Sequence, residues 1–200
     1  MINKTFKSYV AEGALIMFSL LLALMIDKYV EDYQTAQDKD IAIESIKAEL
    51  ARNSEIIETW REKHQAINKR IQAIGNGKEP KLMAELIKQD HFDFGVLTNE
   101  QNLVNAILTD TAWETSKATG IISEFDFETT QKITYVYSVQ KILTETTLAK
   151  ILDFYFSMEA HEMQNLDQIL LQYQLRFGEL VGQEYLLIYL YKEAIEQLDK

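Results

Sequence analysis

Cysteine is absent from this 200-residue chain, and turn-forming residues are scarce, with one proline and seven glycines. Without cysteine the chain can form no disulfide framework, no thiolate metal site and no thiol nucleophile. So few turn residues argue against a protein of many short strands, because reversals between strands commonly use glycine or proline. The composition favours long helices, and we predict an all-α protein.

Basic charge is also in short supply. The chain has 31 acidic and 20 basic residues, which gives a formal net charge of −11 at pH 7. An acidic surface repels phosphate backbones, so nucleic acid is not an expected partner. The hydrophobic share of 47% is that of a globular chain rather than a disordered one.

Catalytic and metal-binding motifs are missing as well. The three histidines, His64, His91 and His161, lack the spacing to glutamate or to a second histidine that zinc proteases and di-iron helices need. The sequence also contains no Gly-rich phosphate loop and no nucleophile elbow. We therefore assign no catalytic, cofactor or metal residue and do not expect an enzyme.

One apolar run stands out: residues 13–26, GALIMFSLLLALMI, carry no charge. A cleaved signal peptide would need a small-x-small cleavage site, which the run lacks. A buried core helix can have this length. Tyr9 and Tyr29 flank the run, as aromatic residues do at membrane interfaces. We favour a membrane anchor helix over residues 1–30 and a soluble helical domain over 31–200.

The anchor is short and bracketed by acids. Fourteen residues rise about 21 Å, against a hydrocarbon core of about 30 Å. At least one of the two carboxylates, Glu12 or Asp27, must therefore lie near the edge of the hydrocarbon. Glu12 either reaches the headgroups or lines the inside of an oligomer. Gly13 begins the run. Ser19 and Ala23 form a small-xxx-small pair that would let two anchors approach closely.

The strongest periodic pattern follows the anchor. Ten positions between residues 43 and 74 alternate by three and four, and eight of them are apolar. We call them the seam: Ile43, Ile46, Leu50, Asn53, Ile57, Trp60, His64, Ile67, Ile71 and Ile74. This spacing predicts one long helix over 31–75, which ends at Gly75 to Pro80. The seam either packs on later helices of the same chain or forms a coiled coil between subunits.

Three seam positions are candidates for a special role. Asn53 is the kind of residue that fixes register or oligomer state in a seam. Trp60 is large for a two-stranded seam. His64 on an apolar face is typical of a hydrogen-bonded core histidine, with a pH switch as the alternative.

The remaining residues, 81–200, predict a helical bundle. We expect helices over 81–88, 98–108, 111–120, 128–145, 147–177 and 183–198, with a break at Gly178 and Gly182. His91 falls in a predicted loop over residues 89–95.

Two blocks of sequence carry a resemblance. The anchor begins Ala11-Glu12-Gly13 and ends Met25-Ile26-Asp27, and residues 111–120 are TAWETSKATG. The chain resembles a family of uncharacterised bacterial single-pass membrane proteins, which have a Glu-led apolar helix and an Ala-Trp-Glu…Gly helix. It lacks the tryptophan that often follows the anchor in that family. The resemblance implies an anchor in the bacterial inner membrane and a helical domain, and it implies no activity.

The basic residues that determine orientation in the membrane are nearly equal in number on the two sides of the apolar run. Lys4 and Lys7 precede the apolar run, and Lys28 and Lys39 follow it. The positive-inside rule marginally favours a cytoplasmic start, with the domain outside.

Together these features predict a membrane-anchored interaction or scaffold module. The expected partners are the lipid bilayer, further copies of the chain in a homo-oligomer, and a separate protein. The alternative is a ligand-sensing effector that signals to the anchor, with Tyr135, Tyr137, Tyr155 and Tyr173 available to line a pocket, or an oligomeric pore lined by Glu12.

Overall fold

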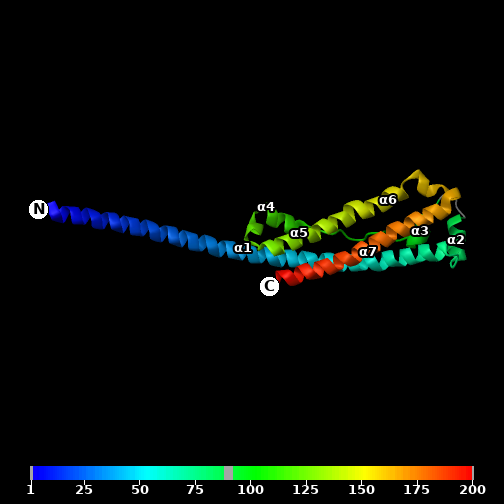
Figure 1. Ribbon diagram of the computed structural model, residues 1–200, viewed down its shortest axis with the longest axis horizontal. Helices are drawn as coiled ribbons and strands as arrows, with labels where there is room; N and C mark the ends of the chain where they lie inside the picture. Colours follow the sequence, from blue (N-terminus) through cyan, green and yellow to red (C-terminus); the bar gives the residue numbers. More distant parts are fainter. Residues whose placement is uncertain (1, 88–91, 200) are drawn as a thin grey trace.

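A computed structural model describes residues 2–87 and 92–199. Most of those residues are helical and none of them lies in a strand, which confirms the predicted all-α class. Helix α1 (Ile2–Gly75) has 74 residues and is therefore about 110 Å long at 1.5 Å per residue. Its first part extends beyond the rest of the protein without contacting another helix, and its second part is one of the helices of a bundle (Figure 1). The predicted order of a long N-terminal helix followed by a bundle is confirmed.

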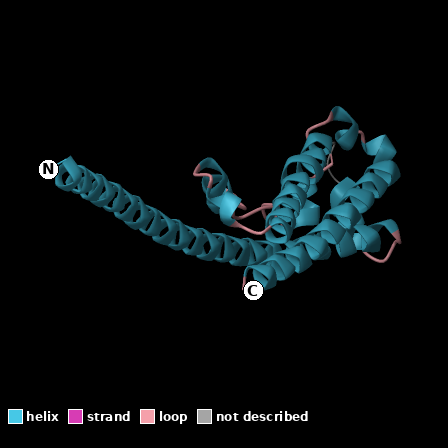
Figure 2. Cartoon of the chain, turned by 60° about the vertical axis from the view of Figure 1, so that its left-hand side comes forward, coloured by secondary structure: helices cyan, strands magenta, loops and turns pink. Residues whose placement is uncertain are grey.

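Two further helical rods complete the bundle. One consists of α5 (Phe127–Lys141), a π-helical segment (Ile142–Leu148) and α6 (Ala149–Tyr155), which follow one another without a turn. The other is α7 (Leu166–Leu198), which runs back along α1 in the opposite direction (Figures 1 and 2). The three rods enclose one hydrophobic core, to which the seam of α1 contributes.

Short elements close the two ends of the bundle. Helices α2 (Pro80–Ile87) and α3 (Phe94–Thr98) lie at the end far from the N-terminus. Helix α4 (Thr111–Ala118) and a 3₁₀ turn (Ile121–Glu124) lie at the other end. Residues 99–110 join α3 to α4 without helical structure, and we call this segment the strap.

The strap contradicts the predicted helix over 98–108. Thr98 is the last residue of α3, and Asn99 and Glu100 both have positive φ angles, 55° and 58°. Two consecutive left-handed residues end a helix, and the N–H of Asn99 bonds the carbonyl of Gly95 as its cap. The capping-box spacing at Thr98 was therefore misleading, because the strap backbone finds its partners on α1.

The predicted break at Gly178 and Gly182 is also wrong. Helix α7 passes through both glycines, because its buried face supports the helix on either side of them. The chain reverses instead between Tyr155 and Leu166, through two 3₁₀ turns (Met158–His161 and Met163–Asn165). The predicted helices over 147–177 and 183–198 therefore have the wrong bounds.

The other predicted helices are confirmed within a few residues. Asp126 begins α5, and its side chain accepts a hydrogen bond from the Thr129 N–H at 2.9 Å. Helix α4 lies within the range predicted for it, and α2 begins at Pro80, one residue before its predicted start. The predicted loop position of His91 lies outside the described residues.

Candidate functional site

The structure buries the seam within its own chain. Nine of its ten positions are buried, and Ile43 is half-buried. Helix α7 is the main surface against which α1 lies. Asn53, Trp60 and His64 are each no more than 2% exposed. The intramolecular alternative for the seam is therefore the one that the structure contains.

The anchor candidates lie on the other half of the same helix. Glu12, Gly13, Ser19, Ala23 and Asp27 are all exposed. The Ser19 hydroxyl donates to the Leu15 carbonyl at 2.9 Å, a bond within the helix. Glu12 and His64 are 52 residues apart, which corresponds to about 78 Å of helix. The structure does not bring the anchor candidates and the seam candidates together.

Polar side chains of α1 hold the strap along its length. Lys63 Nζ donates to the Asn102 carbonyl at 2.7 Å, and Trp60 Nε1 donates to Asn105 Oδ1 at 3.1 Å. An extended segment leaves its backbone groups unpaired unless other groups supply partners. The side chains that bind the strap or the residues next to it are Glu49, Asn53, Trp60, Lys63, His64 and Arg70.

Asn53 is the most connected of these side chains. Its Oδ1 accepts from the Thr109 N–H at 3.1 Å, and its Nδ2 donates to the Thr109 carbonyl at 2.6 Å. The same Nδ2 lies 3.1 Å from Gln140 Oε1, which also accepts from the Tyr191 hydroxyl at 2.7 Å. One buried amide thus joins α1, the strap, α5 and α7.

His64 makes a second connection between α1, the strap and α7. Its Nε2 lies 3.0 Å from the Leu103 carbonyl, which can only accept, so Nε2 carries a proton. Its Nδ1 lies 2.5 Å from Glu184 Oε1 on α7, and both side chains are fully buried. The second carboxylate oxygen, Glu184 Oε2, is buried without a hydrogen-bond partner among the described residues.

Burial shapes the ionisation of Glu184. Removal from water raises the pKa of this carboxyl above its usual value, and the His64 hydrogen bond and the Arg61 charge oppose the rise without cancelling it. A protonated carboxyl could donate to His64 Nδ1, whereas an ionised one would accept from it. The hydrogen bond between Glu184 and the His64 ring can therefore form in either protonation state of the carboxyl.

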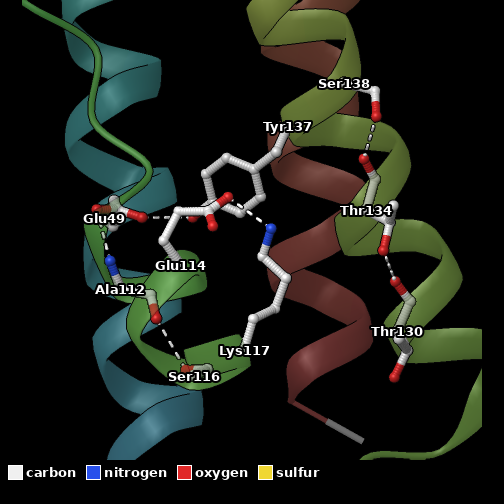
Figure 3. A network of polar contacts seen from close by, with 9 residues as sticks. All are labelled: Glu49, Ala112, Glu114, Ser116, Lys117, Thr130, Thr134, Tyr137 and Ser138. Atoms are coloured by element: carbon white, nitrogen blue, oxygen red, sulfur yellow. Dashed lines mark hydrogen bonds and ion pairs between the residues drawn. The ribbon is translucent and has the colours of Figure 1, made fainter. Parts of the chain in front are cut away.

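Glu49 on α1 is a second buried carboxylate, and Figure 3 shows its polar contacts. The Tyr137 hydroxyl donates to Glu49 Oε1 at 2.6 Å, and the Ala112 N–H donates to Oε2 at 3.0 Å. Burial and the adjacent Glu49 raise the pKa of the Tyr137 hydroxyl, which stays protonated. The Trp113 ring of the TAWETSKATG block stacks on Tyr137 with 5.9 Å between ring centroids. The carboxylate thus joins α1, α4 and α5.

An open groove of about 850 Å³ lies between the strap and the rod that contains α6. Strap residues Leu103, Val104 and Ile107 form one wall. Leu148 and Leu152 belong to the opposite wall, and Trp60 also lines the groove. The groove is therefore an apolar surface whose one wall is hydrogen-bonded to α1.

The lining of the groove also includes acids and aromatic rings. Asp93 and Glu100 are lining residues, and the described lining includes no lysine or arginine. Phe94 and Tyr155 contact each other there, with 5.0 Å between ring centroids. Aromatic faces with nearby carboxylates attract organic cations.

The π-helical segment supplies part of the α6-side wall through Thr144 and Leu148. Such segments widen a helix by one residue per turn and are frequent at functional sites. Of the four tyrosines predicted to line a pocket, Tyr155 lines this groove, Tyr137 and Tyr173 are buried in the core, and Tyr135 is exposed.

Sequence reasoning missed the residues that complete these networks. Glu184 occupies a core position of α7, four residues after Leu180 and three before Leu187. A charged residue in such a stripe was the available signal for a buried pair. Glu49 and Gln140 had no such signal, because the strap that makes them buried was predicted as a helix.

No protein-family model, no curated protein and no solved structure matches this chain. The resemblance to a bacterial membrane-protein family therefore stays a prediction. Among the described residues, no group of three or more histidine, aspartate or glutamate side chains is arranged to hold a metal ion.

Proposed function

We propose that this protein is a membrane-anchored helical module that associates with other proteins, in the first place with copies of itself. The observation that supports this proposal most is the division of α1 into two halves. The seam half is buried in the bundle, whereas the helix that contains residues 13–26 is long and apolar enough to cross a membrane and is uncovered there. No element interrupts the helix between the two halves.

The exposed apolar side chains of the first half need a covering. Leu15, Ile16, Phe18 and Leu21 are each more than half exposed. Burying a side chain of this size is worth about 1.5–3 kcal/mol, so a row of them in water is strongly unfavourable. A bilayer covers all faces of such a helix at once, which fits its exposure on every side.

The arrangement also suits an association role rather than catalysis. The polar groups in the core bind each other and the strap, and the domain also exposes large apolar side chains. Large uncovered apolar surfaces mark interaction sites.

Alkaline extraction of membranes from cells that express the full chain tests the anchor. We expect the protein to stay in the membrane pellet and Leu21→Arg to move into the soluble fraction, because an arginine at mid-span costs about 2.5–3.5 kcal/mol. Ile41→Arg is the matched control, since Ile41 is exposed on α1 beyond the apolar run. Extraction of the unmodified chain into the soluble fraction would overturn the anchor.

Energy transfer between donor-labelled and acceptor-labelled full chains in the same membrane tests self-association. We expect transfer above that of an unrelated single-pass protein at equal density. Transfer equal to that of the unrelated protein would refute the homo-oligomer.

The groove supports a second function, the sensing of an organic cation. The strap wall of the groove is bonded to α1 through Trp60, Lys63 and His64, so an occupant that moves the strap would act on the helix that enters the membrane. We expect the water-soluble cation phenyltrimethylammonium to change Trp60 fluorescence in a Trp113→Phe background. Saturable binding that Glu100→Gln weakens would support this function, and no response at millimolar cation would exclude it for this class of ligand.

A further inference from the structure

The outer face of α7 carries apolar side chains that no described part of the chain covers. Leu171, Leu175, Tyr185, Leu186 and Tyr189 are between 42% and 64% exposed. At 100° per residue these side chains lie opposite the buried face of the same helix, which includes Phe177, Leu180 and Leu187. Helix α7 is thus apolar on two opposite sides, and one of them faces the core.

The exposed side chains follow a heptad spacing. Positions 171, 175, 178, 182, 185 and 189 alternate by four and three, and we call them the outer stripe. Such a spacing keeps one face of a helix against a second helix over its whole length. The outer stripe covers about 27 Å of α7, which is less than three heptads.

Gly178 and Gly182 occupy the middle of the outer stripe. Nothing lies within 4 Å of the place where a Cβ atom would stand at either residue. The bundle itself therefore gives no steric reason for glycine there, although glycine destabilises a helix interior. A bare backbone at this point lets a second helix approach closely between the leucines at one end and the tyrosines at the other.

Charge along the flanks of the outer stripe fits a second copy in parallel orientation. In a parallel pair, Glu179 of one copy faces Gln174 of the other, and Glu193 faces Ile188. No acid therefore faces an acid, although the chain carries a net charge of −11. An unrelated acidic partner would gain no such match.

We propose that the outer stripe binds the outer stripe of a second copy, with the two α7 helices parallel. The orientation rests on the proposed function, because copies anchored in one membrane by the same helix share one direction. Two anchored copies then lie side by side with α7 against α7, and each α1 lies on the far side of its own α7.

The contact area of the outer stripe is small, so we expect the pair to form in the membrane rather than in solution. A fully buried tyrosine covers about 150–250 Å², so the two tyrosines offer roughly 200–300 Å² in each copy. A standard interface buries about 800 Å² per partner, so the outer stripe needs help to form a stable pair. Confinement to one membrane gives this help, because anchored copies share one plane and one direction and so meet more often than freely diffusing copies do.

Disulfide formation in native membranes tests the pairing, because the chain has no cysteine of its own. We expect oxidised membranes to show same-residue dimers for Leu175→Cys and for Tyr189→Cys, at least tenfold above Ser138→Cys, an exposed site on α5. Mixed membranes with Leu171→Cys and Tyr189→Cys would yield a crossed dimer only if the helices were antiparallel, and that product would overturn the proposal.

A second variant separates pairing from folding. The Cβ atom of Gly182→Glu has no atom of the monomer within 4 Å, and the variant places like charges between the two copies. We expect it to reduce the Leu175→Cys dimer at least fivefold without lowering the urea midpoint of unfolding, whereas Ser138→Glu, exposed on α5 and away from the outer stripe, keeps the dimer. Unchanged dimer yield in Gly182→Glu would refute the interface.

The outcomes also separate this inference from the proposed function. Energy transfer between labelled copies without disulfides at the outer stripe would overturn the stripe and leave self-association in place. Absence of both would overturn self-association itself, and soluble protein after alkaline extraction would overturn the anchor.

Discussion

Replacing Asn53 by leucine should destabilise the domain by about 2–4 kcal/mol, through the strap rather than through the core packing. The two side chains have similar size, so the substitution removes hydrogen bonds without leaving a large cavity. It leaves the Thr109 N–H without its partner, and an unsatisfied buried donor costs about 1–3 kcal/mol.

The two oxygen atoms that accept hydrogen bonds from Asn53 Nδ2 each keep another donor in the variant. The Thr109 carbonyl keeps its bond from Gln140 Nε2 at 3.1 Å, and Gln140 Oε1 keeps the Tyr191 hydroxyl at 2.7 Å. The two lost Nδ2 bonds therefore count at their net value of about 0.5–1.5 kcal/mol each, partly offset by the apolar surface that leucine buries.

Urea unfolding of the full chain in mild detergent measures this loss through tryptophan fluorescence. Trp60 bonds the strap and Trp113 follows it on α4, so both report on the segment that Asn53 holds. Asn68→Leu is the control, because Asn68 is half-buried on the same helix and its side-chain bond is a long one from Gln72 at 3.4 Å. Equal midpoints for Asn53→Leu and Asn68→Leu would refute the role assigned to the strap.

Three further predictions follow from the buried groups and from the anchor. Because burial raises the pKa of Glu184 above its unfolded value of 4.5, the native state holds the proton over a pH range in which the unfolded state has lost it. The unfolding free energy should therefore fall, relative to that of Glu184→Gln, as pH rises above about 4.5. His64 and Arg61 are the basic side chains that face Glu184. If the difference in unfolding free energy between the two proteins is constant or grows with pH in urea titrations, this prediction is contradicted. Tyr137→Phe should cost about 1.5–3 kcal/mol, because it removes a hydrogen bond to a buried carboxylate, whereas the exposed Tyr135→Phe should cost less than about 0.5 kcal/mol in the same assay. Ser123→Cys, at an exposed site of the domain, should react with a membrane-impermeant maleimide in intact cells, and labelling only after lysis would place the domain in the cytoplasm.

Occupation of the groove and pairing through the outer stripe would affect α1 in different ways. An occupant of the groove would act on the seam half through the strap, because His64, Lys63 and Trp60 hold the strap there. Pairing through the outer stripe leaves that half untouched and fixes the distance between two anchors instead. The buried His64–Glu184 pair connects both features, since it joins the strap-bearing helix to α7.

The sequence by itself determined the helical class, the anchor-like run and the buried face of α1. These features are local or periodic: a run of apolar residues and a three-four spacing have the same consequence whatever the rest of the chain does. For the same reason the bounds of α2, α4 and the start of α5 could be predicted from caps and glycines.

Only the tertiary structure decided the strap, the position of the chain reversal and the partners of the buried polar groups. Residues 99–110 have capping signals and apolar spacing that suit a helix, yet their backbone bonds are satisfied by side chains of α1, more than thirty residues away in sequence. In the sequence Gly178 and Gly182 indicate a helix end, but in the structure α7 continues through both because its buried face packs on the core along its whole length. Such choices depend on which distant groups meet, because hydrogen bonds across the fold compete with local ones, and a linear pattern cannot weigh the two.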